Sequence, residues 1–112
     1  MKKIEAIIRP ARVSHVCEAL DKVGHPGMML TEIEGHGKQK GMTKVLRGKE
    51  YHVEFMTKTK IDIVAKDEDV ARIVQAIREA AFTGEVGDGK IFVSAMEDAI
   101  RIRTDEKGDT VL

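Results

Sequence analysis

The pattern of apolar and polar positions predicts a chain that alternates strands with helices. Residues 2–8 are rich in Ile and are followed by Pro10, which indicates a short strand. Beyond Pro10 the apolar residues recur at helical spacing over 13–23, and Gly24 predicts the end of that helix. A second strand is expected over 28–34.

Residues 37–50, in the middle of the chain, lack the apolar periodicity of the first segments. Regular structure is expected to stop at 35–37, and residues 37–50 hold three glycines and five Lys or Arg, which predicts a long exposed loop. From 51 to 63 apolar and polar residues alternate with period two, which is typical of a long strand. An amphipathic helix over 67–81 follows, with Asp67 as its expected cap.

The last segments complete a recognisable order of elements. Residues 90–95 form the fourth predicted strand, and 100–103 alternate Ile with Arg, which predicts a short extended tail. Two strand–helix–strand units joined by a loop match an α+β, ferredoxin-like split βαβ fold (βαββαβ), with both helices on one face of an antiparallel sheet. Apolar residues in the last strand point to both faces, so we expect a homo-oligomer that covers the second face.

Composition limits the possible functions. The 112 residues, 42% of them hydrophobic and 34% charged, predict a single globular domain over 1–112. Because 19 Lys and Arg balance 19 Asp and Glu, and aromatic residues make up only 4%, nucleic acid is not expected as the main partner. The lone Cys17 favours a cytoplasmic location, and no run approaches the roughly 20 apolar residues that membrane insertion needs.

The strongest local motif is Thr83-Gly84-Glu85-Val86-Gly87-Asp88-Gly89-Lys90. Three glycines followed by a lysine favour phosphate binding, because backbone amides can converge on an anion there. A helix C-cap followed by a Gly-Asp-Gly turn explains the same residues equally well, and the order of a P-loop is absent.

Two arginines lie close together near the end of the chain. Arg101 and Arg103 would point the same way from an extended segment, about 7 Å apart, and could grip a phosphate. From the residues alone, a charged, solvated edge strand is the better interpretation. The four histidines show no metal-ligand spacing, and no nucleophile or paired carboxylate predicts catalysis, so the chain is not expected to be an enzyme.

Four segments carry a resemblance that extends over the full length: MKKIEAIIRP, GKQKG with RGKEY, TGEVGDGKIFV and AIRIRT. The chain resembles the PII nitrogen-signalling proteins. The resemblance implies a homotrimer with a long loop at about 37–55, a C-terminal tail at about 97–112, and ATP or ADP bound in clefts between neighbouring subunits. It also implies a sensor that binds 2-oxoglutarate together with MgATP and regulates ammonium transport or assimilation through the loop.

The resemblance assigns roles to individual residues. The residues implied in nucleotide binding are Ile7, Met29, Gly35, His36, Gly37, Lys38, Gln39, Asp62, Val64, Gly87, Asp88, Gly89, Lys90, Arg101 and Arg103, with the two arginines reaching across from the adjacent subunit. Those implied in 2-oxoglutarate binding are Gly37, Gln39, Lys40, Gly41 and Lys58, and Gln39 would also ligate Mg²⁺. Arg47 would enter the mouth of an ammonium channel, and Tyr51 would be the target of a uridylyltransferase.

Several residues depart from the family's usual pattern, namely Met29, Lys38, Met42, Leu46, Lys49 and Thr57. Because most of them fall in or beside the loop, a PII-like protein that serves another transporter or enzyme is an alternative. A small ferredoxin-like hydrolase of phosphate esters or acyl phosphates is a third alternative, which the lack of a nucleophile or base disfavours.

Overall fold

A computed structural model describes residues 1–25, 27–36, 42–46, 49–53 and 55–112. Four strands form one antiparallel sheet in the order β2-β5-β1-β6, and two further strands, β3 and β4, form a separate ladder. The strands are β1 (Lys2–Ile8), β2 (Met29–His36), β3 (Met42–Leu46), β4 (Lys49–Val53), β5 (Phe55–Ala65) and β6 (Lys90–Ala95). The helices are α1 (Val13–Lys22) and α2 (Asp67–Ala81), and short 3₁₀ turns occupy Pro10–Arg12 and Gly108–Val111.

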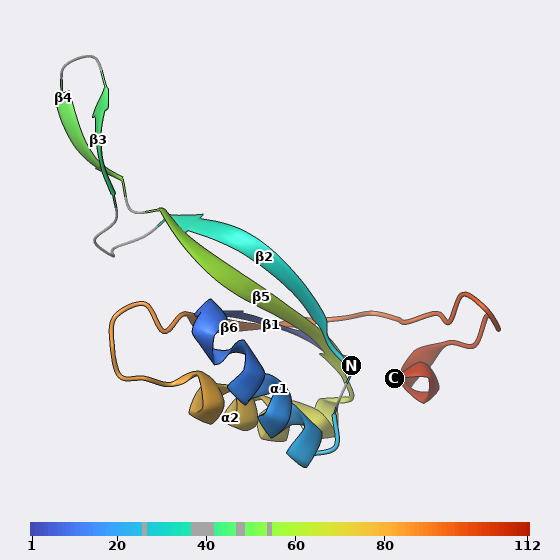
Figure 1. Cartoon of the computed structure of the whole chain (residues 1–112). Coiled ribbons are helices and arrows are strands. Elements are labelled where there is room, and N and C mark those ends of the chain that lie inside the picture. Colours follow the sequence, from blue (N-terminus) through green and yellow to red (C-terminus); the bar gives the residue numbers. More distant parts are fainter. Residues whose placement is uncertain (26, 37–41, 47–48, 54) are drawn as a thin grey trace.

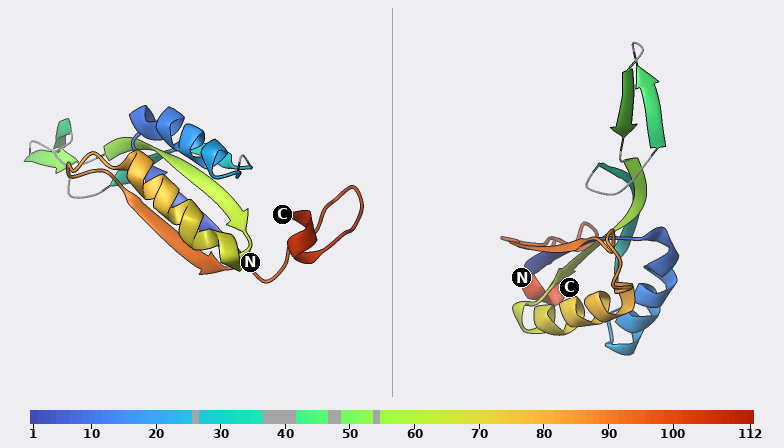
Figure 2. Two further views of the ribbon diagram at one scale, coloured as in Figure 1. Left: turned by 90° about the horizontal axis from the view of Figure 1, so that it is seen from below. Right: turned by 90° about the vertical axis from the view of Figure 1, so that its left-hand side faces the viewer.

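Both helices lie side by side on one face of the sheet (Figures 1 and 2). Strand β5 lies between β1 and β2, and β1 lies between β5 and β6, so each strand–helix–strand unit is split by a strand of the other. This arrangement confirms the predicted α+β, ferredoxin-like fold. No helix in the described ranges is long and apolar enough to cross a lipid bilayer.

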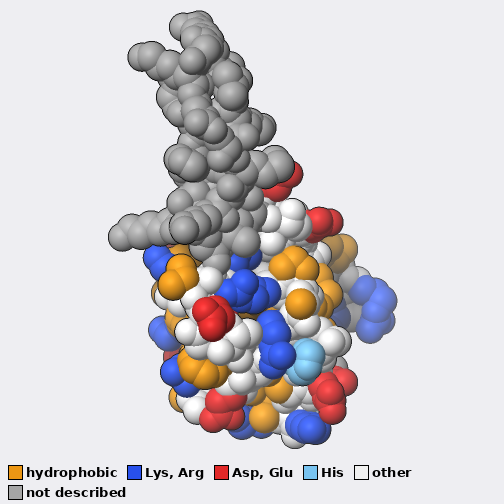
Figure 3. Space-filling view, turned by 60° about the vertical axis from the view of Figure 1, so that its left-hand side comes forward, with side chains coloured by type: hydrophobic (Ala, Val, Ile, Leu, Met, Phe, Trp, Pro, Cys, Tyr) orange, Lys and Arg blue, Asp and Glu red, His pale blue; other side chains and the backbone are white. Residues whose placement is uncertain are grey.

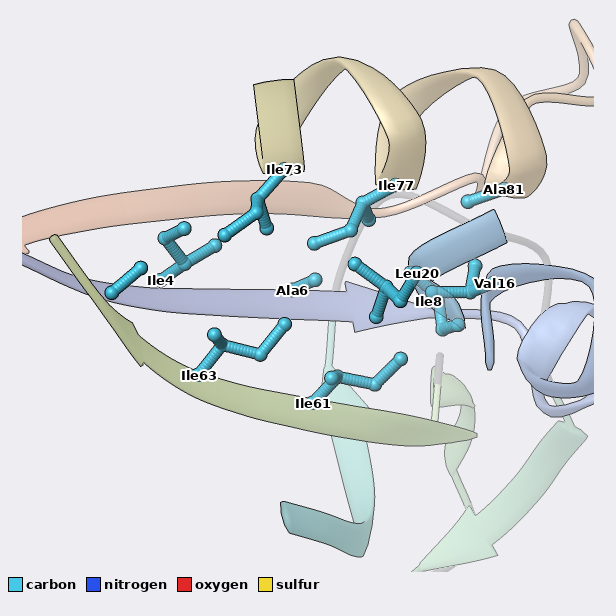
Figure 4. Packing of buried hydrophobic residues seen from close by; sticks show 11 residues of the cluster. Ile4, Ala6, Ile8, Val16, Leu20, Ile61, Ile63, Ile73, Ile77 and Ala81 are labelled. Carbon is cyan, nitrogen blue, oxygen red and sulfur yellow. The ribbon is translucent and has the colours of Figure 1, made fainter. Parts of the chain in front are cut away.

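The core lies between the helices and the sheet. Alternate residues of β1 and β5 face inward, and α1 and α2 cover them with the apolar stripes that the helical spacing predicts (Figure 4). The largest fully buried side chains are Ile4, Ile8, Val16, Leu20, Ile61, Ile63, Ile73 and Ile77. Burying each of these side chains stabilises the fold by roughly 1.5–3 kcal/mol before entropy is counted.

The segment between β2 and β5 differs from the prediction. Strand β2 continues two residues beyond the predicted 28–34 and ends at His36, within the expected stop at 35–37, but β3 with β4 forms an antiparallel hairpin inside the predicted loop. The single strand expected over 51–63 is two strands, because β4 ends at Val53 and β5 begins at Phe55 in another sheet. The hairpin projects away from the four-stranded sheet (Figures 1 and 2).

The start of α2 also differs from the prediction. Asp67 is the first helical residue rather than the cap, and Lys66 occupies the cap position without a side-chain hydrogen bond. The Asp67 carboxylate instead pairs with the amino group of Met1 at 3.0 Å, which ties the start of β1 to the start of α2. The pKa of Asp67 is lowered by its hydrogen bond to that amino group and by the group's charge.

The C-terminal tail is folded back, so the predicted extended segment at 100–103 is wrong. Residues 102–104 form a turn, Ile100 pairs with Lys107 in an isolated bridge, and the Arg101 backbone N–H donates to the Glu106 carbonyl at 2.8 Å. The Arg101 side chain pairs with the Glu106 carboxylate, also at 2.8 Å. The two arginines therefore do not share one face of a strand.

Candidate functional site

The glycine loop, residues 83–89, connects α2 to β6 and is organised around one carboxylate. Asp88 Oδ2 accepts hydrogen bonds from the backbone N–H groups of Thr83 and Gly84, each at 2.9 Å. Its Oδ1 accepts from the Thr83 hydroxyl and from Arg9 Nε at 3.2 Å. The bonds from Thr83 are the largest cause of a pKa for Asp88 well below its usual range, so this carboxylate remains charged at neutral pH.

The end of the loop lies directly against β1. Gly89 has φ +101°, and a Cβ atom added there would lie 1.6 Å from the Ile7 carbonyl oxygen. Both the backbone conformation and the close approach exclude every residue except glycine. The contact fixes the loop relative to β1 at the point where Ile7 pairs with Lys90.

Two cationic side chains hold successive carbonyl groups of the same loop. Arg9 Nη2 donates to the Val86 carbonyl at 2.8 Å, and Lys58 Nζ donates to the Gly87 carbonyl. Lys58 is only 8% exposed. Its burial and the neighbouring Arg9 charge lower the pKa of Lys58, and the Asp88 charge opposes this shift.

These contacts leave a distinct set of backbone donors unused. Thr83 Oγ1 accepts from the Glu85 N–H at 3.2 Å, so the N–H groups of Thr83, Gly84 and Glu85 are all engaged by side chains. Within the described part of the chain, no hydrogen bond uses the N–H of Gly87 or Asp88. Two adjacent free N–H groups beside Lys58 and Lys90 form the kind of backbone nest that binds an anion.

A pocket of about 270 Å³ adjoins the glycine loop at the end of α2. Its wall is mainly apolar, with Ala81 and Phe82 from the helix end and Ile7 from β1, and Gly89 and Lys90 also line it. Apolar walls with a few polar groups are typical of small-ligand sites.

The sheet face opposite the helices carries a charged cluster. Lys3 Nζ pairs with Glu5 at 2.8 Å, and the 7% exposed Asp62 lies between Lys3 and Lys60, at 3.9 and 3.6 Å. Asp62 Oδ1 is buried, and no described residue donates a hydrogen bond to it. A buried acceptor without a donor is costly, so this oxygen is suited to receive a hydrogen bond from a ligand or another chain.

The structure brings together only some of the predicted site residues. Ile7, Lys58 and residues 87–90 meet around the glycine loop. Asp62 pairs across the sheet with Met29, and Val64 lies two residues further along β5 on the same face. The tail with Arg101 and Arg103 lies at the opposite end of β6 from the glycine loop (Figures 1 and 2).

The side chains of the other predicted residues are not described by the structure. Gly37, Lys38, Gln39, Lys40, Gly41 and Arg47 lie outside the described residues. For Gly35, His36 and Tyr51 the structure describes the backbone alone, which belongs to β2 and β4.

Comparison with known proteins agrees with these features. The family model described as "Nitrogen regulatory protein P-II" matches residues 1–106. The chain belongs to the P-II family. This confirms the resemblance found in the sequence.

Characterised P-II proteins cover almost the whole chain. The P-II protein of Azospirillum brasilense is 54% identical over 108 residues, and that of Bradyrhizobium diazoefficiens is 56% identical over 108 residues, each alignment covering 96% of both chains. Among solved structures, Arabidopsis thaliana PII bound to citrate superposes with a TM-score of 0.79 at 38% identity, covering 97% of this chain and 86% of that one. These relatives are nitrogen regulatory proteins, which confirms that the chain is a regulatory protein and not an enzyme.

Two residues that organise the glycine loop were not predicted from the sequence. Arg9 contacts loop residues 77 and 79 positions away, so no local pattern indicates its role. Thr83 was noted within the glycine motif, but its hydroxyl and N–H bonds to Asp88 depend on how the loop folds. The helix C-cap expected at Gly84 is wrong, because Phe82 is the C-cap of α2 and the Gly84 N–H donates to the Asp88 carboxylate instead. The phosphate interpretation of the motif stays a prediction.

Proposed function

We propose that this P-II protein senses nitrogen, carbon and energy status by binding ATP or ADP and, together with MgATP, 2-oxoglutarate. The observation that carries the proposal is the glycine loop, whose side chains leave the Gly87 and Asp88 N–H groups free beside two lysines. Such a site is suited to phosphate oxygens, because backbone donors and cations act there together.

The proposed nucleotide extends from the glycine loop over the sheet. Gly87, Asp88, Gly89 and Lys90 hold the phosphates, with Asp88 contributing its backbone N–H, because its carboxylate is already engaged by Thr83, Gly84 and Arg9. Ile7, Asp62 and Val64 contact the nucleoside, and Asp62 Oδ1, to which no described residue donates a hydrogen bond, offers an acceptor for one of its donors. Backbone groups of Met29, Gly35, His36, Gly37 and Lys38 complete the proposed cleft.

The proposed assembly is a homotrimer in which the tail of one protomer completes the cleft of the next. The C-terminal tail, which carries Arg101 and Arg103, leaves β6 at the end away from the glycine loop of its own chain (Figures 1 and 2), which supports a contact with the loop of a neighbour. Exposed apolar residues support an assembly, since Phe92 is 53% and Ile102 is 100% exposed in the single chain. Light scattering during gel filtration tests this, and a monomer would contradict it.

The proposed effector site includes Lys58 and the backbone of Gly37, Gln39, Lys40 and Gly41. Lys58 would pair with a carboxylate of 2-oxoglutarate, and the binding of citrate, a polycarboxylate, by the Arabidopsis relative supports a site for such anions. The described residues contain no cluster of three His, Cys, Asp or Glu side chains that could hold a metal. This fits a Mg²⁺ ion bound mainly by phosphate oxygens, with the amide oxygen of Gln39 as the proposed protein ligand.

Calorimetric titration with 2-oxoglutarate tests the function directly. We expect binding in the presence of MgATP and little binding without nucleotide or with ADP, because only the triphosphate completes the effector site. Equal binding under all three conditions, or no binding under any, would reject the proposed sensor. Titration with 2-oxoglutarate of a Lys58→Met variant that retains ATP binding then tests the residue assigned to the carboxylate.

The proposed target is an ammonium channel or another nitrogen-regulated protein, which the loop at about 37–55 would reach through Arg47. Affinity capture of an ammonium channel by the wild type and by Arg47→Ala tests this role, and capture that does not depend on Arg47 would refute it. Tyr51 is the proposed site of uridylylation, which mass spectrometry after incubation with a uridylyltransferase would detect. The proposed location is cytoplasmic, and the proposed domain spans 1–112.

A further inference from the structure

We propose that Arg9 is a positioning residue of the phosphate site, which aims the backbone N–H groups of the glycine loop without contacting the ligand itself. The inference rests on the proposed nucleotide binding and adds to it a residue that no motif in the loop contains. Arg9 follows β1 directly, and its guanidinium bridges the Val86 carbonyl and the Asp88 carboxylate, at 2.8 and 3.2 Å.

The geometry of the peptide bond links these carbonyl contacts to the direction of the N–H groups of Gly87 and Asp88. In a trans peptide the C=O and the following N–H point in opposite directions. Arg9 binds the Val86 carbonyl, so the Gly87 N–H points away from Arg9. Lys58 binds the Gly87 carbonyl, so the Asp88 N–H points away from Lys58.

The second contact of Arg9 fixes the loop's internal scaffold. Asp88 Oδ1 accepts from Arg9 and from the Thr83 hydroxyl, while Oδ2 accepts from the N–H groups at the start of the loop. The guanidinium also offsets a negative charge that would otherwise repel phosphate oxygens close by. A planar guanidinium can serve both acceptors at once in a fixed geometry, whereas a lysine ammonium is a single point charge.

The neighbouring Arg12 provides a matched control. Arg12 is also half-buried, and its guanidinium donates to the Ala80 carbonyl at 3.0 and 2.7 Å, near the C-terminal end of α2. Within the described residues, its side chain forms no hydrogen bond with the glycine loop. Replacing either arginine removes a positive charge and two hydrogen bonds, but only the loss of Arg9 releases the loop.

The test compares ATP with adenosine, which has the nucleoside but no phosphate. We expect Arg9→Ala to raise the Kd for MgATP about tenfold in calorimetry, as for the loss of one charge-assisted contact, and to change the adenosine Kd by less than about twofold in an NMR titration. Arg12→Ala should leave the ratio of the ATP affinity to the adenosine affinity at the wild-type value, even if the melting temperature of Arg12→Ala falls by as much as that of Arg9→Ala.

Arg9→Lys separates geometry from charge and covers the case in which Arg9→Ala does not fold. The lysine keeps the positive charge but cannot bridge both acceptors. The ATP affinity of Arg9→Lys should therefore lie between those of the wild type and Arg9→Ala. If Arg9→Ala does not fold, the ATP affinity of Arg9→Lys should still lie below that of the wild type. The amide resonances of Gly87 and Asp88 should move in both Arg9 variants and not in Arg12→Ala.

The outcomes distinguish the two claims. Wild-type protein that binds neither ATP nor adenosine would reject the nucleotide function and the role of Arg9 together. Wild-type binding with Arg9→Lys at full ATP affinity would reject the positioning role alone. If Arg9→Ala weakened the binding of ATP and of adenosine by the same factor, the positioning role would also be rejected, because Arg9 would then affect the whole site and not the phosphate contacts in particular.

Discussion

Replacing Gly89 by alanine tests the contact between the glycine loop and β1. The added Cβ would lie 1.6 Å from the Ile7 carbonyl oxygen, whereas real Cβ contacts are essentially never shorter than 3.0 Å. The two backbones must therefore separate by about 1.4 Å. That oxygen belongs to the backbone of a strand paired on both sides, so it cannot turn away as a flexible side chain could.

The cost of this replacement has two parts. An L-residue at the positive φ of Gly89 costs roughly 1–2 kcal/mol, and displacing the backbone adds a similar or larger amount, for a total of about 3 kcal/mol or more. Gly24 separates the two parts, because it also has a positive φ, +77°, but a Cβ there meets nothing within 4 Å. Gly24→Ala should therefore cost only the first part, roughly 1–2 kcal/mol.

Urea unfolding of both variants at one fixed protomer concentration measures the difference, since an oligomer's stability depends on concentration. We expect Gly89→Ala to unfold at a much lower urea concentration than Gly24→Ala and to lose ATP affinity, while Gly24→Ala keeps it. If the two variants differ in unfolding free energy by less than about 0.5 kcal/mol, the close approach of the loop to β1 is wrong.

Three further changes test the core, the loop carboxylate and the assembly. Ile77→Ala, at a fully buried position of α2, should reduce the unfolding free energy by about 2–5 kcal/mol in urea titrations, and a loss below 1 kcal/mol would contradict the packing. Asp88→Asn should lower the melting temperature at pH 7 and by a smaller amount at pH 3, because the depressed pKa contributes stability that is fully present above the ordinary value of 3.8 and is lost progressively as the pH falls from there toward the folded-state pKa. A melting-temperature difference that is the same at both pH values would refute this. Lys90→Ala and Arg103→Ala should each lose ATP binding, whereas co-expressed chains of the two variants should regain a fraction of the sites, and calorimetry showing no recovery would refute a shared cleft.

The regular elements of the fold could be predicted because their signals are local. Residues 2–8 and 90–95 form β1 and β6 with the predicted bounds, and α2 covers the predicted 67–81. Strand β1 and helix α2 each bury one apolar row or stripe, so the period of the sequence is the same as the period of the structure, whereas β6 is mostly exposed in the single chain.

The wrong predictions concern segments without such a stripe. Strands β3 and β4 pair outside the main sheet, and a ladder of backbone hydrogen bonds leaves little trace in a segment rich in Lys and Gly. The Ile–Arg alternation at 100–103 resembles a strand, but the bridge from Ile100 to Lys107 folds the tail into a turn instead. Local alternation cannot reveal a partner strand, or the absence of one.

The site could be predicted from its motif only in outline. The glycine spacing indicated a phosphate site, yet the same residues suited a helix cap, and only the folded loop shows that the cap is Phe82 rather than Gly84. The deciding contacts join residues far apart in sequence: Arg9 to Val86 and Lys58 to Gly87. No rule of spacing can pair such positions, because β1 and β5 come to the loop only through the order of strands in the sheet.

That strand order also explains why one chain would carry two incomplete halves of a site. Strand β6 has the glycine loop before its first residue and the arginine tail beyond its last, and six extended residues separate them by roughly 20 Å. A rigid strand cannot bend its two ends together, so in the proposed assembly the tail would meet the loop of another copy. A contact of this head-to-tail kind is not self-complementary and must either continue as a filament or close into a ring. A closed ring would give one composite cleft for each copy, and the proposed nucleotide binding would then depend on assembly.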